Sequence, residues 1–203
     1  MTTTSPATPV TTRKPTILTW QGVGAPRLES VRLLVAERRF KASGRLIAAA
    51  DGDSDAYSTS FEAATDESGT FSRLLLRVTT AEEERQISVN RTEDGLWLVD
   101  RGQGSERSTF GGALEVDVAG AVTFNALPIR RLNLHRESGR HELPVVFVSL
   151  PDLSVRVTQQ TYTTISVNDD GAVVNFSSDT FTADLTVDSA GFVVDYPDLA
   201  SRV

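Results

Sequence analysis

Two adjacent arginines, Arg130 and Arg131, and one upstream acid, Asp117, could do chemistry together. In an extended segment over residues 127–134, each arginine shares a side of the chain with leucine or isoleucine side chains. At least one guanidinium must then approach apolar surroundings, where it needs a partner. A carboxylate accepts a bidentate fork from arginine, so a buried clamp from Asp117 to either arginine is the favoured interpretation. The alternative is a head-group site, in which the spare arginine grips a phosphate, a carboxylate or a sugar hydroxyl.

Several aromatic side chains could stack on a sugar face or line an acyl tunnel, although most such residues belong to a core. Tyr162 lies near Gln160, and Tyr196 follows Asp195, which suits a rim where a polar head group meets an apolar tail. The candidate ligand-binding residues are Trp20, Asp117, Phe124, Arg130, Arg131, Tyr162 and Tyr196.

The sequence carries no recognisable catalytic motif. It has no Gly-x-Ser-x-Gly elbow, no Walker loop and no His-Glu-x-x-His, and it contains no cysteine. His135 and His141 flank an expected turn at Ser138-Gly139, but their spacing matches no metal motif. We therefore expect a non-catalytic protein with no catalytic residue, no bound metal and no cofactor. A hydrolase acting on a sugar or lipid ester is the alternative, since paired carboxylates cannot be read from sequence spacing.

Charge and hydropathy restrict the partners of the chain. A net charge of −7 argues against nucleic acid, which binds proteins largely through Lys and Arg. No apolar stretch approaches the length of a transmembrane helix, and residues 1–15, rich in Thr and Pro, lack the apolar core of a secretory signal. We expect a disordered tail over 1–15, a single domain over 16–203 and a cytoplasmic location.

The elements that must position these residues are mainly strands. Apolar and polar residues alternate over 57–63 and again over 181–187, and turn pairs such as Asp94-Gly95 separate the runs. This pattern predicts an all-β fold of about ten to twelve strands. Residues 28–40 fit a strand or a helical stripe, and we favour a strand. Residues 120–125 have no clean period and predict a long connection or short helix, after which Pro128 turns the chain into the sheet.

A set of short segments in fixed order resembles a bacterial glycolipid-binding family, and the resemblance covers Trp20 to Arg202. The segments are Gly112–Asp117, Thr123–Asn125, Leu127–Leu132, Pro151–Leu153, Gln160–Thr163 and Val187–Pro197.

The resemblance implies a strongly curved antiparallel half-barrel whose concave face is covered by a short helical segment, similar to bacterial lipoprotein-localisation factors. It also implies a glycolipid or other acyl-chain ligand held between the sheet and the covering segment. A structural or interaction protein, whose pocket is filled by its own side chains, is a further alternative.

Overall fold

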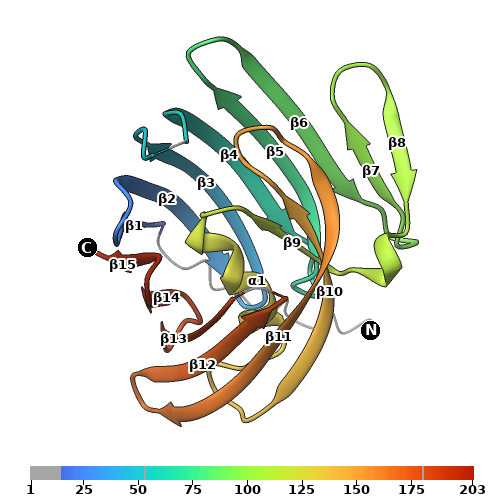
Figure 1. Ribbon diagram of the computed structural model, residues 1–203. Coiled ribbons are helices and arrows are strands. Elements are labelled where there is room, and N and C mark those ends of the chain that lie inside the picture. Colours follow the sequence, from blue (N-terminus) through green and yellow to red (C-terminus); the bar gives the residue numbers. More distant parts are fainter. Residues whose placement is uncertain (1–14, 53, 180) are drawn as a thin grey trace, which may run out of the picture.

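A computed structural model of the protein describes residues 15–52, 54–179 and 181–203. Apart from Pro15, the expected disordered tail lies outside these residues. Within them, fifteen strands form one sheet (Figure 1). The strands are β1 (Thr16–Gly22), β2 (Arg27–Ala36), β3 (Arg39–Ala48), β4 (Tyr57–Thr65), β5 (Phe71–Thr79), β6 (Glu84–Arg91), β7 (Trp97–Asp100), β8 (Ser105–Ser108), β9 (Glu115–Val118), β10 (Arg140–Val148), β11 (Val155–Asn168), β12 (Gly171–Ser178), β13 (Thr182–Asp188), β14 (Val193–Tyr196) and β15 (Ala200–Arg202).

The order of strands divides the sheet into two halves. From one edge to the other the order is β8 to β1, then β15 back to β9, with β1 and β15 paired at the centre. We call β1–β8 the N-terminal half and β9–β15 the C-terminal half. All neighbours are antiparallel except β9 and β10, which are parallel. The chain passes between the two edges through a 3₁₀ turn, η1 (Phe110–Gly112).

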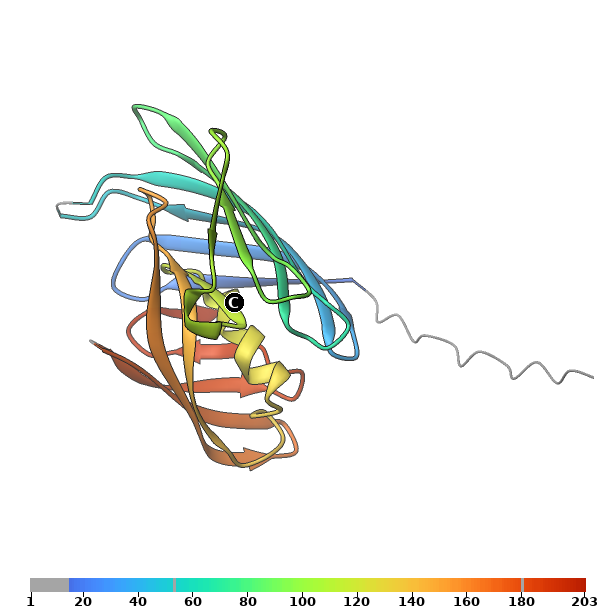
Figure 2. The ribbon, with the colours of Figure 1, turned by 90° about the vertical axis from the view of Figure 1, so that its right-hand side faces the viewer.

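The sheet is strongly curved, and a helical segment lies on its concave side, as Figures 1 and 2 show. This segment, residues 119–139 between β9 and β10, is called the crossover; it contains η2 (Val122–Asn125) and α1 (Ala126–Arg131). The predicted curved, mainly antiparallel sheet with one short covering helix is confirmed. The strand number exceeds the predicted ten to twelve because β7, β8, β9, β14 and β15 have only three or four residues each.

The local structure corrects one prediction and confirms two. Residues 127–131 are helical, so the extended segment expected there, with Pro128 turning into the sheet, is wrong. Pro128 lies in the first turn of α1, where its missing N–H is not needed. Asn133 ends the helix with a positive φ of 57°, and the N–H of Leu134 bonds to the Ile129 carbonyl at 2.9 Å. The preference for strand over helix in residues 28–40 is confirmed, although the segment is divided between β2, which ends at Ala36, and β3, which begins at Arg39. The short helix after Gly120 is also confirmed.

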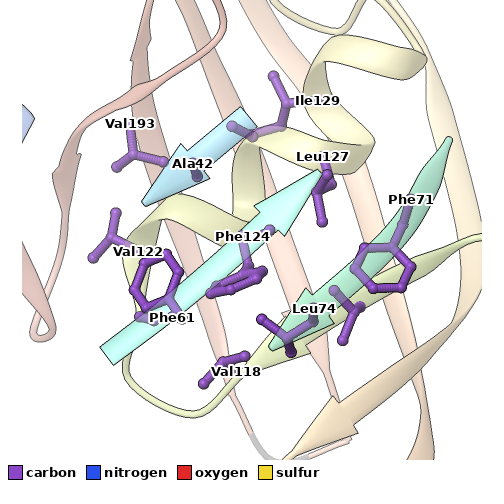
Figure 3. Packing of buried hydrophobic residues seen from close by; sticks show 14 of the residues in the cluster. Ala42, Phe61, Phe71, Leu74, Val118, Val122, Phe124, Leu127, Ile129 and Val193 are labelled. Carbon is purple, nitrogen blue, oxygen red and sulfur yellow. The ribbon is translucent and has the colours of Figure 1, made fainter. Parts of the chain in front are cut away.

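The core lies between the curved sheet and the crossover and takes buried side chains from both halves of the sheet (Figure 3). Alternation places Phe61 of β4 and Leu74 of β5 on the concave face, where both are fully buried. The Phe124 ring from η2 packs on the Phe61 ring, with 5.2 Å between centroids. The crossover is thus fixed to the sheet by apolar packing. Across the described ranges, no helix is long and apolar enough to cross a membrane.

Candidate ligand-binding site

Two buried carboxylates fix the ends of the helical crossover. Glu29 of β2 accepts hydrogen bonds from the N–H groups of Val122, at 2.5 Å, and Thr123, at 3.3 Å. These amides begin η2 and have no partner within it, so the carboxylate satisfies them. Glu115 of β9 forms an ion pair with Arg131, in the last turn of α1. Burial raises the pKa of Glu29 to about 7; it also raises that of Glu115 to about 7, although Arg131 opposes the rise.

The expected clamp between Asp117 and an arginine is wrong, because Glu115 takes that role. Glu115 and Asp117 are two residues apart in β9 and face the same side of the sheet. Arg131, carried by α1 rather than by an extended strand, reaches Glu115. Arg130 donates instead to the backbone carbonyls of Ala190 and Glu37, the latter at 2.8 Å.

Asp117 ends a chain of side-chain hydrogen bonds that begins on the crossover. Asn125 donates to the hydroxyl of Tyr162 at 3.1 Å, and that hydroxyl donates to the Gln160 side-chain oxygen at 3.0 Å. The Gln160 amide then donates to Asp117 at 2.7 Å. We call these four residues the polar relay. Burial raises the pKa of Asp117 to about 6, against the lowering effect of the Gln160 hydrogen bond. The relay therefore links the half-buried carboxyl group of Asp117 to the crossover.

A pocket of about 350 Å³ opens where the relay reaches the surface. Its walls come from β9–β12, from the turn after β12, from β14 and from the start of the crossover, so it lies between the C-terminal half and the crossover. We call it the sheet–crossover pocket. It brings together four aromatic rings with carboxyl, amide and guanidinium groups, and its main lining residues are Asp117, Asn125, Phe147, Arg156, Gln160, Phe176, Phe181 and Tyr196.

The aromatic wall of this pocket is continuous. Phe176 packs against Tyr196, with 6.1 Å between centroids, and against Phe181 at 6.4 Å. On the other wall the Arg156 guanidinium lies over the Phe147 ring, 4.5 Å from its centroid. Phe181 keeps 38% of its surface exposed, which places it at the mouth. The arrangement places flat apolar faces next to hydrogen-bonding groups, which is typical of small-molecule sites.

The candidate residues from sequence fall into four places. Asp117 and Tyr196 line the sheet–crossover pocket. Tyr162 lies behind it as part of the relay, while Phe124 and Trp20 belong to the core, where the Trp20 indole donates to the Val193 carbonyl at 2.9 Å. The remaining two candidates, the arginines of α1, lie at the far end of the crossover.

Sequence reasoning missed the buried acids Glu29 and Glu115 and the pocket residues Arg156, Phe176 and Phe181. One signal was available for Glu29, which stands on the side of β2 that otherwise carries buried valine and leucine.

His135 is buried, with its ring nitrogen 3.4 Å from the Ile129 carbonyl. The described residues contain no cluster of three or more His, Asp or Glu side chains that could hold a metal ion.

Comparisons with known proteins identify the family and support the fold. A family model described as "Putative glycolipid-binding" matches residues 17–202. Among solved structures, the fold is similar to the crystal structure of a DUF1089 family protein from Pseudomonas aeruginosa, with a TM-score of 0.73 and 23% sequence identity. That similarity covers 91% of this chain and 95% of the other, and at this identity it shows the fold alone. No curated protein matches the sequence.

Proposed function

The chain belongs to the family described as glycolipid-binding, and from this membership we propose that it binds a glycolipid without catalysing a reaction. The sugar head group occupies the sheet–crossover pocket. Its ring packs on the aromatic wall, and its hydroxyls bond to Asp117, Gln160 and Arg156.

The mixed lining of the pocket is the observation that carries this proposal. Ligand pockets are concave, mostly apolar and equipped with a few fixed polar groups, with typical volumes of roughly 300–1,000 Å³. The volume of about 350 Å³ suits a head group and the first part of a tail. The space beneath α1 is filled by Phe124, Leu127 and Ile129, all buried. The tail therefore leaves past Phe181 and does not run under the helix.

Binding is tested first with the protein as purified. Extraction with organic solvent followed by mass spectrometry detects a co-purifying glycolipid. Titration calorimetry with a short-chain alkyl glucoside, kept below its micelle concentration, measures affinity. We expect Asp117→Asn and Phe181→Ala each to weaken binding about tenfold, because each removes a contact worth roughly 1.4 kcal/mol.

The matched control for Phe181→Ala is Ile165→Ala, which removes another exposed hydrophobic side chain, 59% exposed, outside the pocket. Its affinity stays at the wild-type value. The proposal fails if no lipid co-purifies and no alkyl glucoside binds. That result would favour the structural or interaction role.

A hydrolase is the second candidate, because a carboxyl group with a pKa of about 6 facing a pocket suits a general acid. A second carboxylate, that of Asp179, also lines the pocket. This candidate predicts release of sugar or fatty acid from a chromogenic glycoside or ester, and loss of that release in Asp117→Asn. Binding without turnover across both substrate classes separates the two functions.

A further inference from the structure

A second pocket, of about 500 Å³, lies at the other end of the crossover and shares no lining residue with the first. We call it the basic pocket. Its polar lining comes from the turn between β2 and β3 and from the end of the crossover, and consists of Glu37, Arg38, Arg130, Asn133, His135 and Arg136. No aromatic ring other than that of His135 lines it, so its chemistry differs from that of the sheet–crossover pocket.

Arg130 forms the fixed wall of the basic pocket. Its guanidinium joins two turns by donating to the carbonyls of Glu37, after β2, and Ala190, after β13. It also lies over the Phe192 ring, 5.2 Å from the centroid. The second turn approaches closely at Gly191, which has a φ of 83° and where an added Cβ would stand 2.8 Å from Arg130 Cγ. The charge is therefore held in place by both turns.

The other two guanidinium groups face the opening without a protein partner. Arg38 and Arg136 are exposed, and neither guanidinium forms an ion pair or hydrogen bond with any residue of the described ranges. Glu37 is the one carboxylate in the lining. Asp188, which lies behind His135, is already bound by Arg202 at 2.6 Å. The lining holds three arginines and one glutamate, so the pocket is positively charged although the chain has a net charge of −7.

The pKa of His135 responds to the charges of the nearby arginines. Burial lowers the pKa of its imidazole, and the charges of Arg136 and Arg130 lower it further, while the Ile129 carbonyl and Asp188 oppose the change. An anion bound between the arginines would offset their charge at the ring.

We propose that the basic pocket binds the phosphate group of a phosphate ester. Guanidinium groups match phosphate oxygens in fork geometry, and they are less strongly hydrated than ammonium groups, which favours their use in such sites. Arg130 supplies a positioned charge, Arg38 and Arg136 close on the phosphate from two different segments, and the Asn133 amide bonds to an oxygen. The volume leaves room for the organic part of the ester, which can be a soluble metabolite or a lipid head group.

The test follows the His135 imidazole by NMR while glycerol 3-phosphate is added at constant ionic strength, with sodium chloride as the reference salt. The chain has two histidines, so His141→Gln assigns the signals. We expect the ester to raise the pKa of His135, because the bound anion offsets the charges of Arg136 and Arg130 that lower it. Vesicles of phosphatidylcholine with phosphatidic acid, compared with phosphatidylcholine alone, distinguish a lipid source in a sedimentation assay.

The decisive variant is Arg38→Gln with Arg136→Gln, which leaves Arg130 and the turns intact. It should weaken binding at least tenfold without changing the melting temperature. Arg73→Gln with Arg107→Gln removes the same charge from exposed positions of β5 and β8 and should bind like wild type. The proposal is overturned if chloride gives the same His135 shift, if the decisive variant binds normally, or if neither the soluble ester nor the phosphatidic acid vesicles bind.

Discussion

The two halves of the sheet contribute to one apolar core, but the polar side chains on their concave faces differ in surroundings. In the N-terminal half most inward-facing side chains are apolar and buried, as at Val31, Phe61 and Leu74. In the C-terminal half, Asp117 and Gln160 face the same way and border a pocket. The crossover takes part in both, because Phe124 packs on Phe61 in the core while Gly120, Ala121 and Asn125 line the pocket. Both halves therefore pack against the crossover, which also forms one wall of the pocket in the C-terminal half.

A buried acid illustrates the same contrast. Glu29 is a polar residue on the otherwise apolar face of the N-terminal half. Its two carboxyl oxygens accept hydrogen bonds from two backbone N–H groups of the crossover. Asp117 in the C-terminal half has one side-chain donor, Gln160, and borders open volume. Both oxygens of the first acid are bonded within the fold, whereas the second borders the pocket in which we propose that the head group binds.

The largest expected effect separates the core from the pocket by comparing a ring of the crossover with a ring at the pocket mouth. Phe124→Ala removes a fully buried ring that packs on Phe61 and leaves a cavity, so we expect a loss of about 3–5 kcal/mol in the free energy of unfolding. Phe181→Ala, at the pocket mouth, should cost less than about 1 kcal/mol. Urea denaturation measures both. Equal losses would contradict the assignment of Phe124 to the core and of Phe181 to the pocket mouth.

The next effect is a pH dependence that arises from Glu29. Its folded pKa, about 7, lies above its ordinary value of 4.5, so the folded state keeps a proton that the unfolded state releases. The associated stability is fully present below about pH 4.5 and is lost as pH rises to about 7. Glu29→Gln cannot titrate, so its stability should fall less over that window, by up to about 3 kcal/mol.

Urea denaturation at pH 4.5, 6 and 7.5 measures this difference. Glu115 and Asp117 also have raised pKa values, so some decline remains in the variant. Glu62→Gln, on the exposed side of β4, is the matched control and should follow the wild-type curve. A Glu29→Gln curve parallel to wild type would mean that Glu29 is ionised in the fold.

Period-two alternation was sufficient to predict most strands, because each has one buried and one wet face. The run over 57–63 lies in β4 (Tyr57–Thr65), and the run over 181–187 overlaps β13 (Thr182–Asp188). The same rule misled at α1. Leu127 and Ile129 alternate with Pro128 and Arg130, a spacing equally suited to a strand, and the helix is decided by burial against a distant sheet.

The candidate site was less predictable, because its contacts join residues far apart in the sequence. Alternation places Glu115 and Asp117 on one face and cannot say which one meets an arginine. That choice depends on where α1 holds Arg131. Likewise, the approach of Phe176 and Tyr196 to the crossover follows from the curvature of the whole sheet, which no local pattern encodes.

The smallest effect concerns the polar relay, which connects the crossover to the pocket. Tyr162→Phe removes one hydroxyl and leaves the Asn125 amide and the Gln160 oxygen without that partner in a buried setting, so we expect a loss of about 1–2 kcal/mol in urea denaturation. Tyr57→Phe is the control, since the Tyr57 hydroxyl makes no hydrogen bond to any described residue. If the relay also orients Asp117, Tyr162→Phe weakens alkyl glucoside binding severalfold although its ring stays out of the pocket. A variant that loses stability but binds normally would mean that the Tyr162 hydroxyl stabilises the fold and does not orient Asp117 for binding.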